Sequence, residues 1–409
     1  MTSVTPRIAI VGGGPAGLCL GVLLHKYGIP FTIYDLRNKP MKDFLSEPSG
    51  PLDLHEETGL AAIRSSGLWD KFVPLTTECS RTLKVVDKHG RLTYTNNGEQ
   101  QHRPEIPRNA LTLLLLSSVP AENITWGHKL QNATRTPEGK ILLNFGSNGT
   151  AEYDFVIGAD GAWSKIRQLL TNIKPHYGGV QYTTLHILNA TSRYADLSNL
   201  VGPGTCFVLG DKNGVFSQRG VEDSIRLYVS ISTKSEENLE KATEKVTVAS
   251  LKKLLLTDPD MFGMWGDETK GLISTACDEE AARMKVAQLP PFKPMYMLPI
   301  GHKWPAQPGL ALIGDAAHLM MPWAGEGVNQ ALRDALDLAN ATATAYRSSQ
   351  NPTEFRECLT PLVAEFDKEM FSRTQAAAEK TWANSNLIFS ASAVQAMGGM
   401  IDSHLTKLD

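Results

Sequence analysis

A glycine-rich turn near the amino terminus constrains the fold of this chain more than any other feature. It follows the apolar run Ile8–Val11 and has the pattern GxGxxG, with its glycines at Gly12, Gly14 and Gly17. Residues 18–28 then have a helical pattern, and a second apolar run, Phe31–Tyr34, ends in Asp35. This order predicts a buried parallel strand, a tight turn, a helix and a second strand, the first unit of a Rossmann-like α/β sheet.

The turn has the chemistry of a dinucleotide site. The first glycine allows the sharp bend, the second lets the backbone approach a pyrophosphate, and the third lets the helix pack against the strand. Free N–H groups at the start of the helix favour the negative charge of phosphates. Asp35 lies about 20 residues further along, where a carboxylate can accept a hydrogen bond from a ribose hydroxyl. A glycine turn that binds nothing would leave this spacing unexplained, but glycines alone do not distinguish FAD from NAD(P).

Two later segments have the same order of strand and turn. Residues 154–161 lead to Asp160, and residues 310–318 carry Asp315 at the end of an apolar run. Ligands bind at the carboxyl ends of strands in open α/β sheets, and a carboxylate there can accept hydrogen bonds from polyol hydroxyls. Residues 325–329 precede a further helix, so their N–H groups can stabilise an anion such as the ring of a reduced flavin.

Composition excludes several classes of protein. The chain has 409 residues, with 40 Lys and Arg against 43 Asp and Glu. It therefore lacks the excess of basic residues that proteins use to bind nucleic acids or anionic membranes. Apolar runs such as Leu113–Leu116 are too short to span a bilayer. Five scattered cysteines without CxxC spacing argue against disulfides and zinc, and the first residues do not resemble a secretory signal. We therefore expect a cytoplasmic protein without a metal site.

In their order and separation, the three segments resemble the fingerprints of the single-component flavoprotein aromatic hydroxylases, which have the p-hydroxybenzoate hydroxylase fold. The matching motifs are GxGxxG, the DG motif at Asp160 and Gly161, and the GD motif at Asp315. The resemblance implies non-covalently bound FAD. The implied cofactor-binding residues in these segments are Gly12, Gly14, Pro15, Ala16, Gly17, Asp35, Arg37, Asp160, Asp315, Pro322, Gly325, Gly327, Val328 and Asn329.

The resemblance also implies an α/β domain organisation, in which a Rossmann-like FAD-binding domain receives an inserted, β-sheet-rich substrate domain. Alternating apolar and polar residues, as in Val180–Ile187 and Ser224–Ser232, support the β-rich insertion. Residues 361–390 lack glycine and are rich in Ala, Glu and Lys, which predicts a long helix. We expect the FAD-binding domain at residues 1–72, 99–177 and 290–360, the substrate domain at 73–98 and 178–289, and a C-terminal helix within 361–409.

Two further stretches are similar to one branch of the family, the TetX-type monooxygenases that inactivate tetracyclines. They are Gly50–His55 and Pro104–Asn109. In that branch the matching Asp and Arg contact FAD, which implies the same for Asp53 and Arg108. The residues by themselves favour plainer interpretations, a helix-start aspartate and a surface arginine at the head of a helix.

The sequence departs from the family at three positions. Residues 325–329 match the loop that faces the flavin in this family, and we call them the flavin loop. Glu326 stands there where Gln is usual, and we expect it to point to solvent because a carboxylate facing an anionic flavin would be repelled. The ribose acid is Asp35 where many relatives have Glu, and the basic residue that often follows directly is displaced to Arg37. Ser46 stands where the TetX-type branch has an Arg associated with NADPH, which leaves the binding of the nicotinamide nucleotide open.

Substrate contacts should come from the β-rich domain and the flavin loop. Residues 217–220 align by spacing with a substrate-contacting strand of the TetX-type branch. Arg219 could pair with an enolate or carboxamide oxygen of a polyketide, or it could be a solvated hairpin residue. Residues 224–232 alternate between one face that packs in the core and one that faces solvent or a pocket. Met321 and Trp323, just before the flavin loop, could line the pocket or belong to the core. The candidate substrate residues are Gln218, Arg219, Tyr228, Met321 and Trp323.

The resemblance implies a monooxygenase in which NADPH or NADH reduces FAD. O2 then forms a C4a-hydroperoxyflavin, which transfers one oxygen atom to a phenolic or polyketide substrate, with a tetracycline as one candidate. Because the cofactor carries this chemistry, we expect no side chain to act as acid or base, and we interpret His318 as structural. We expect a monomer that binds a small aromatic molecule and O2. The alternatives are a salicylate-like hydroxylase of small phenols, a flavin-binding protein without turnover, and a pyridine-nucleotide dehydrogenase, against which the DG and GD motifs argue.

Overall fold

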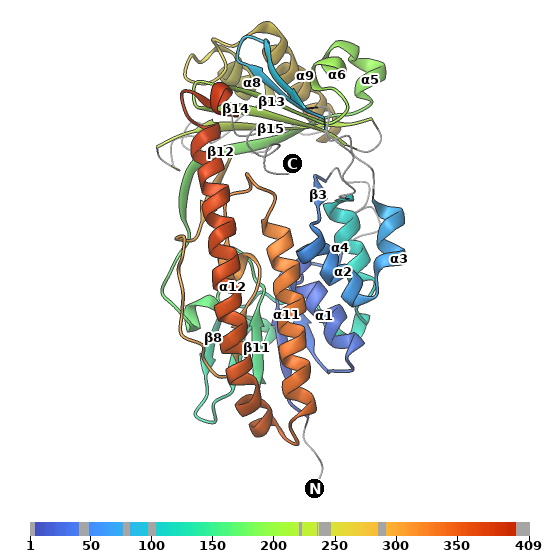
Figure 1. The fold of residues 1–409 in the computed structure, drawn as a ribbon, viewed down its shortest axis with the longest axis vertical. Helices are drawn as coiled ribbons and strands as arrows, with labels where there is room; N and C mark the ends of the chain where they lie inside the picture. Colours follow the sequence, from blue (N-terminus) through green and yellow to red (C-terminus); the bar gives the residue numbers. More distant parts are fainter. Residues whose placement is uncertain are drawn as a thin grey trace, which may run out of the picture. The chain divides into compact units, whose positions relative to one another are not determined.

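The chain forms two compact units (Figure 1). A computed structural model describes residues 5–40, 49–76, 82–96, 104–220, 223–234, 236, 247–284 and 292–397. Unit 1 comprises the described residues within 1–76, 103–176 and 296–381, and unit 2 comprises those within 77–102, 177–295 and 382–409. Each unit is thus assembled from segments that are distant along the chain.

Unit 1 is built on a five-stranded parallel sheet. The strand order is β17-β11-β1-β2-β7, so strands from all three nucleotide-related segments are neighbours. Val11 aligns with Tyr34 and Gly158, and Gly158 aligns with Leu312, so these strands end at one edge of the sheet. The predicted parallel arrangement is confirmed. The strands are β1 (Ile8–Val11), β2 (Thr32–Tyr34), β7 (Ile124–Thr125), β11 (Phe155–Gly158) and β17 (Leu310–Leu312).

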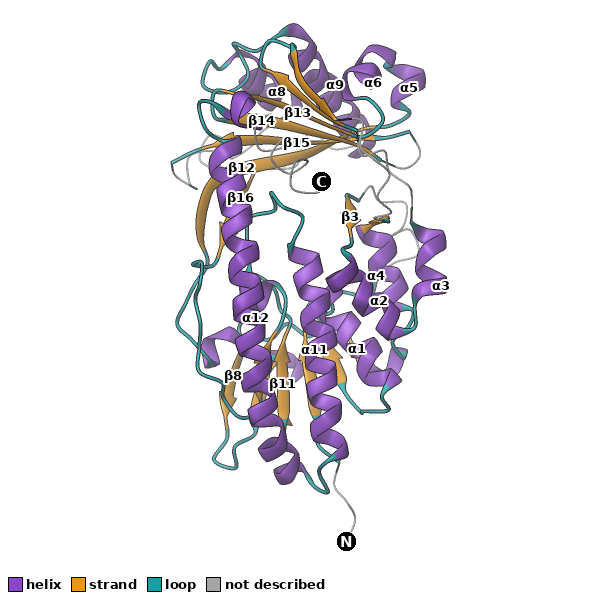
Figure 2. Ribbon diagram, viewed as in Figure 1, coloured by secondary structure: helices purple, strands orange, loops and turns teal. Residues whose placement is uncertain are grey.

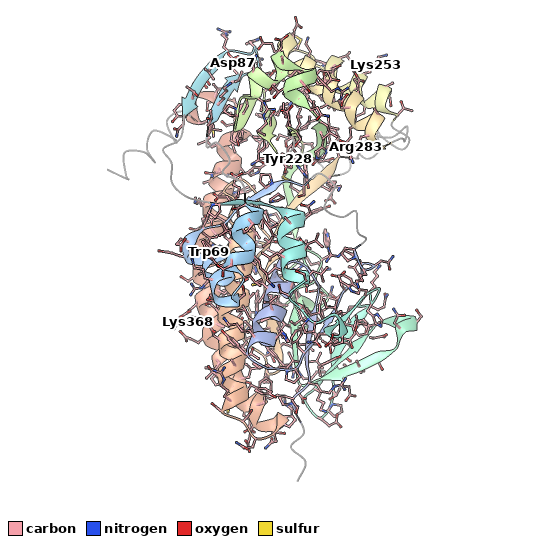
Figure 3. The ribbon with its side chains drawn as sticks, turned by 90° about the vertical axis from the view of Figure 1, so that its right-hand side faces the viewer. Trp69, Asp87, Tyr228, Lys253, Arg283 and Lys368 are labelled. Atoms are coloured by element: carbon pink, nitrogen blue, oxygen red, sulfur yellow. The ribbon has the colours of Figure 1, made fainter. Side chains whose placement is uncertain are left out.

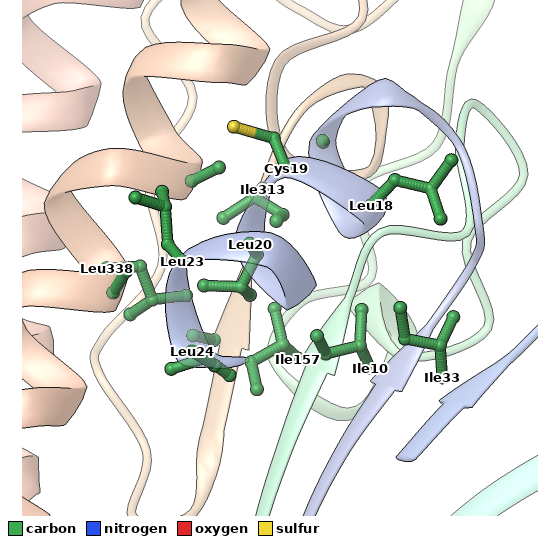
Figure 4. Packing of buried hydrophobic residues seen from close by; sticks show 14 of the residues in the cluster. Ile10, Leu18, Cys19, Leu20, Leu23, Leu24, Ile33, Ile157, Ile313 and Leu338 are labelled. Carbon is green, nitrogen blue, oxygen red and sulfur yellow. The ribbon is translucent and has the colours of Figure 1, made fainter. Parts of the chain in front are cut away.

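The core of unit 1 lies between this sheet and two helices, α1 (Pro15–Lys26) and α11 (Gly327–Arg347). Leu20 and Leu24 of α1 lie close to Ile157 of the sheet and Leu338 of α11 (Figure 4). All four side chains are fully buried, and burying one such side chain stabilises a fold by about 1.5–3 kcal/mol. The uninterrupted apolar runs of the motif strands are explained by burial on both faces of a parallel sheet.

Smaller elements surround this core. An antiparallel pair is formed by β3 (Pro51–Asp53) and β6 (Glu105–Pro107), and a three-stranded antiparallel sheet by β8 (Asn132–Arg135), β9 (Ile141–Asn144) and β10 (Thr150–Tyr153). The short helices are α2 (Ala61–Ser66), α3 (Trp69–Phe72), α4 (Arg108–Leu116) and α10 (Asp315–His318). Single turns occur at Glu56–Leu60, Val73–Leu75, Ala121–Asn123, Gly146–Asn148 and Arg167–Leu169.

Unit 2 is built on a seven-stranded mixed sheet with the order β16-β12-β15-β14-β13-β4-β5 (Figure 2). Its strands are β4 (Leu83–Asp87), β5 (Leu92–Asn96), β12 (His176–Ile187), β13 (Thr205–Gly210), β14 (Asn213–Arg219), β15 (Ile225–Ser232) and β16 (Lys293–Met297). The helices are α5 (Ala190–Arg193), α6 (Ala195–Val201), α8 (Val248–Thr257) and α9 (Asp267–Met284). The β-rich stretch of the sequence therefore also contains two substantial helices, α8 and α9, that its pattern did not predict.

The long helix near the carboxyl terminus, α12, begins earlier than predicted. It spans Pro352–Ile388 and includes Pro361 in its interior, whereas residue 361 was expected to open it. Proline is favourable in the first turn, where Pro352 sits, and Pro361 is exposed. Phe355, Val363 and Phe366 of α12 belong to the core of unit 1. None of the described helices has the length and apolar content needed to cross a membrane.

Candidate cofactor site

The glycine turn at the end of β1 is shaped by close packing on one side and is open on the other. Gly12 has φ of +112°, and a Cβ there would lie 2.1 Å from the carbonyl oxygen of Ala159. A Cβ on Gly17 would lie 2.0 Å from the carbonyl oxygen of Gly12. A Cβ on Gly14 would meet nothing within 4 Å. The first and third glycines are therefore required by the fold, whereas the second leaves space for a ligand.

The first turn of α1 presents an environment that suits phosphate. Pro15 is the first helical residue, Gly14 provides no side-chain cap, and the turn contains no acidic residue. Ala16 is buried. The free N–H groups and the positive end of the helix dipole therefore face no protein carboxylate within this turn.

Asp35 and Arg37 form one unit with the glycine turn. The Asp35 carboxylate accepts hydrogen bonds from the Gly13 N–H at 2.7 Å and from two nitrogens of the Arg37 guanidinium at 2.7 and 2.9 Å. Arg37 also donates to the Gly13 carbonyl at 2.9 Å. Burial alone would raise the pKa of Asp35, but these hydrogen bonds and the Arg37 charge outweigh it and lower the pKa. Arg37, two residues after Asp35, thus contacts the glycine turn and favours the ionised form of Asp35.

Asp160 and Asp315 lie at the same edge of the sheet, after β11 and β17. Asp160 accepts hydrogen bonds from the N–H groups of Lys165, at 2.7 Å, and Ile166, which shapes the turn that follows the strand. Asp315 is exposed at the first position of α10, and its carboxylate has no hydrogen-bond partner among the described residues. An exposed, unpaired acid at the carboxyl end of a parallel strand is available to a ligand with hydroxyl groups.

Asn329 joins the flavin loop to a distant part of the chain. Its side chain is fully buried near the start of α11, where its oxygen accepts a hydrogen bond from the His55 N–H at 2.8 Å. Its nitrogen donates to the carbonyls of Asp53 at 2.8 Å and Gly325 at 3.1 Å. This brings the segment with Asp53 beside the loop with Pro322, Gly325, Gly327 and Val328, whose backbone or side chains are at least partly exposed.

The two TetX-like stretches are also brought together. They form the β3–β6 pair, in which Pro51 aligns with Pro107 and Asp53 with Glu105. Arg108 follows at once as the first residue of α4, and its N–H donates to the Gly50 carbonyl at 3.0 Å. Its side chain is exposed. Strand pairing therefore places both candidate residues on one small ribbon but at opposite ends of it, with Asp53 beside Glu105 and Arg108 beside Gly50.

The prediction that Glu326 points to solvent is wrong. Its side chain is only 12% exposed, and its carboxylate accepts hydrogen bonds from Lys380 at 3.0 Å and Gln330 at 3.3 Å. The His55 ring lies between two acids, with Nδ1 3.8 Å from Glu326 and Nε2 3.6 Å from Asp53. A partner on α12, which the local sequence does not reveal, makes the inward position of Glu326 possible.

A buried acid on α11 is hydrogen-bonded to the backbone of the GD motif at Gly314. Asp334 of α11 accepts hydrogen bonds from the Gly314 N–H at 2.9 Å, from His318 Nε2 at 2.5 Å and from Arg373 of α12 at 3.0 Å. His318 is itself buried, in agreement with its interpretation as structural. Sequence reasoning missed Asp334 and Arg373 because only the tertiary fold brings α11, α12 and the motif together.

A second buried acid near this cluster predicts a pH-dependent stability. Asp367 of α12 is 3% exposed, and burial, together with the charge of Asp334, raises its pKa from 3.8 to about 7 against an opposing effect of Trp304. Between these values the folded chain holds a proton that the unfolded chain releases, so the free energy of unfolding falls as pH rises. We expect D367N to gain stability relative to the wild type in urea denaturation as pH rises from about 4 to about 7, and to keep that advantage at about pH 8. Parallel pH profiles, or the same change in the exposed variant D70N, would contradict this.

The candidate substrate residues of unit 2 do not share a face. Gln218 pairs with Arg226, and Phe216 with Tyr228, on one face of the sheet (Tyr228 is labelled in Figure 3). Arg219 pairs with the core residue Ile225 on the other face, because side chains alternate along a strand. There its guanidinium donates to the Ser198 and Gly202 carbonyls, the Ser198 hydroxyl and the Asp223 carboxylate.

The remaining candidates lie in or beside the flavin loop. Met321 is 1% exposed, and its carbonyl accepts a hydrogen bond from the Thr381 hydroxyl, so it is held within unit 1. Trp323 is partly exposed. Ser46 lies outside the described residues.

The residues at the sheet edge fit FAD. The open space at Gly14 and the acid-free helix start suit a pyrophosphate, and the unpaired Asp315 suits a polyol chain. The start of α11 also lacks acidic residues in its first turn, and the one adjacent carboxylate, Glu326, is paired. Within the described first turns of α1 and α11, no unpaired carboxylate opposes an anionic, dinucleotide-like cofactor.

Comparison with known proteins agrees with this site. A sequence profile described as FAD binding domain matches residues 5–263 and 302–354. Monooxygenase asqM of Emericella nidulans is 34% identical over 95% of this chain and 96% of that protein. A salicylate hydroxylase substrate complex superposes with a TM-score of 0.71 at 18% identity, covering 100% of this chain and 96% of that one. Tetracycline destructase Tet(55) gives a TM-score of 0.61 at 19% identity, covering 96% and 97%.

The chain belongs to the FAD binding domain family and has the p-hydroxybenzoate hydroxylase type of fold. It is an FAD-dependent monooxygenase, and therefore an oxidoreductase. The similarity to the tetracycline-inactivating branch is one of fold, since Tet(55) shares far less sequence with this chain than asqM does.

Proposed function

We propose that this monooxygenase uses NADH or NADPH to reduce bound FAD and inserts one atom of O2 into a planar aromatic or polyketide substrate. The other oxygen atom leaves as water, with the two electrons supplied by the nicotinamide. The observation that carries the proposal is the meeting of the open glycine turn, Asp35 and the unpaired Asp315 at one sheet edge. Bound FAD supplies electron transfer and oxygen activation, and the protein positions it.

The residues of unit 1 have distinct tasks in this proposal. The glycine turn and the start of α1 hold the pyrophosphate. Asp35 accepts a hydrogen bond from a ribose hydroxyl, and Asp315 accepts hydrogen bonds from hydroxyls of the ribityl chain. Asn329 keeps Asp53 beside the flavin loop through its two donated hydrogen bonds. We also assign Asp160, which follows β11, and Arg108, which begins α4, to the cofactor site.

An aromatic face on the unit 2 sheet supports an aromatic substrate. Phe207 aligns with Phe216, which aligns with Tyr228, and the Phe207 and Phe216 ring centroids are 5.0 Å apart. Tyr182 lies on the same face, with its ring centroid 6.4 Å from that of Tyr228. Flat rings and a polar Gln218 favour a planar molecule that carries oxygen substituents. We place Gln218 and Tyr228, but not Arg219, among the substrate contacts.

A substrate screen tests the proposal. Purified protein should be yellow and release FAD on denaturation, and it should oxidise NADH or NADPH faster when a suitable aromatic compound is added. The panel should contain a tetracycline, salicylate and larger hydroxylated polycyclic compounds, with products analysed by mass spectrometry for one added oxygen atom. Protein that cannot be reconstituted with FAD would overturn the proposal. A response to salicylate alone would instead favour a small-phenol hydroxylase.

Two adjacent substitutions in β14 separate substrate binding from folding. R219A removes several partly buried hydrogen bonds on the helix-covered face, so we expect it to lower the free energy of unfolding by about 1–3 kcal/mol. Q218A lies on the aromatic face and should raise KM for the best substrate with little change in stability. Urea denaturation and steady-state kinetics measure the two effects. A large KM effect of R219A without destabilisation would restore Arg219 as a substrate contact.

A further inference from the structure

The flavin loop contains an ion pair that spans two helices. Glu326 immediately precedes α11, and Lys380 comes from the last part of α12, both within unit 1. The Lys380 Nζ lies 3.0 Å from one oxygen of the Glu326 carboxylate, and Gln330 donates to the other oxygen. The carboxylate is 12% exposed and the lysine 52% exposed. The acid is thus enclosed, and the cation reaches it from the solvent side.

Around Glu326, acidic and basic side chains are paired with one another. Gln330 is itself held by Arg373, which pairs with Asp334. His55 lies between Glu326 and Asp53. Two cations of α12 therefore face acids of the α11 region: Lys380 pairs with Glu326, and Arg373 pairs with Asp334 and lies 3.7 Å from Asp337. Without Lys380, the closest fixed cation to Glu326 would be lost.

We infer that Lys380 cancels the charge of Glu326 and thereby keeps a bound flavin easy to reduce. The inference rests on the proposed placement of the flavin at residues 325–329. Reduction adds negative charge to the ring, so an uncompensated carboxylate in this loop favours the oxidised form, and a neutral pair does not. Lys380 is a positioning residue in this scheme, since it acts through Glu326. The pair makes an acid tolerable where the family usually has Gln.

The test measures the reduction potential of bound FAD in four variants at low ionic strength, where exposed charges are least screened. K380M leaves Glu326 uncompensated and should shift the oxidised-to-reduced equilibrium about tenfold toward oxidised flavin, or about 30 mV for a two-electron couple. E326Q leaves Lys380 unpaired and should shift it in the opposite direction. The double variant E326Q/K380M should return to the wild-type potential within about a factor of three, because both versions of the loop are neutral.

K368M is the matched control. Lys368 lies on the same helix, is exposed and pairs with Glu365, so its loss changes the net charge equally but away from the loop (Figure 3). Equal potentials for K380M and K368M, in protein that retains FAD, would overturn the inference while leaving the flavin function intact. If K380M does not retain FAD, recovery of FAD in the double variant supports the inference, and no recovery overturns it. Wild-type protein that binds no FAD would instead refute the proposed function itself.

Discussion

Replacing Asp334 by alanine should lower the free energy of unfolding by about 3–5 kcal/mol, the usual cost of removing one partner of a buried charge pair. Asp334 is fully buried and accepts three hydrogen bonds, from Gly314, His318 and Arg373. Burial alone would raise its pKa, but His318, Arg373 and the Gly314 N–H lower it, so the carboxylate is ionised. Its removal leaves the guanidinium of Arg373 and the backbone of the GD motif without this acceptor. Urea denaturation measures the loss.

Asp337 offers a control for D334A on the same helix. It lies one turn further along α11, is 19% exposed, pairs with Arg333 at 2.8 Å and lies 3.7 Å from Arg373, which is closer to Asp334. Such pairs near the surface contribute about 0.3–0.5 kcal/mol, so D337A should change stability by less than 1 kcal/mol. Equal destabilisation by D334A and D337A would show that Asp334 has no special structural role.

Replacing Asp315 by alanine should weaken FAD binding about 10- to 100-fold. A hydrogen bond to a charged group is worth about 1.5–3 kcal/mol, and each 1.4 kcal/mol changes affinity tenfold. The same substitution should leave the stability of FAD-free protein within about 0.5 kcal/mol of the wild type, because Asp315 is exposed and its carboxylate is unpaired among the described residues. Quenching of flavin fluorescence gives the affinity, and thermal unfolding of the FAD-free protein gives the stability.

The contrast between binding and stability makes the D315A result interpretable. D315N keeps an acceptor oxygen but loses the charge, so its affinity should lie between those of D315A and the wild type. Unchanged flavin affinity in D315A would remove Asp315 from the cofactor site. A large loss of stability in the FAD-free protein would mean that the side chain supports the fold instead.

Much of the cofactor site could be predicted from the sequence. The glycine spacing and the acids after β2, β11 and β17 could be predicted because each depends on a turn or strand end only a few residues long. Asp35, Asp160 and Asp315 share one sheet edge, as parallel strands require. Helices α8 and α9 were harder to predict from the sequence. They lie in a stretch whose other segments alternate like strands, and Gly271 interrupts the helical pattern of α9.

The sequence by itself determined the local chemistry of the glycine turn, because sterics at Gly12 and Gly17 permit little else. Only the tertiary structure decided which distant groups meet. Asn329 holds Asp53 across 276 residues of sequence, and Glu326 finds its cation 54 residues away on α12. Alternation along β14 puts Arg219 and Gln218 on opposite faces, but only the fold shows that the face of Arg219 is the one covered by helices. Such contacts depend on how distant segments pack, which no local pattern contains.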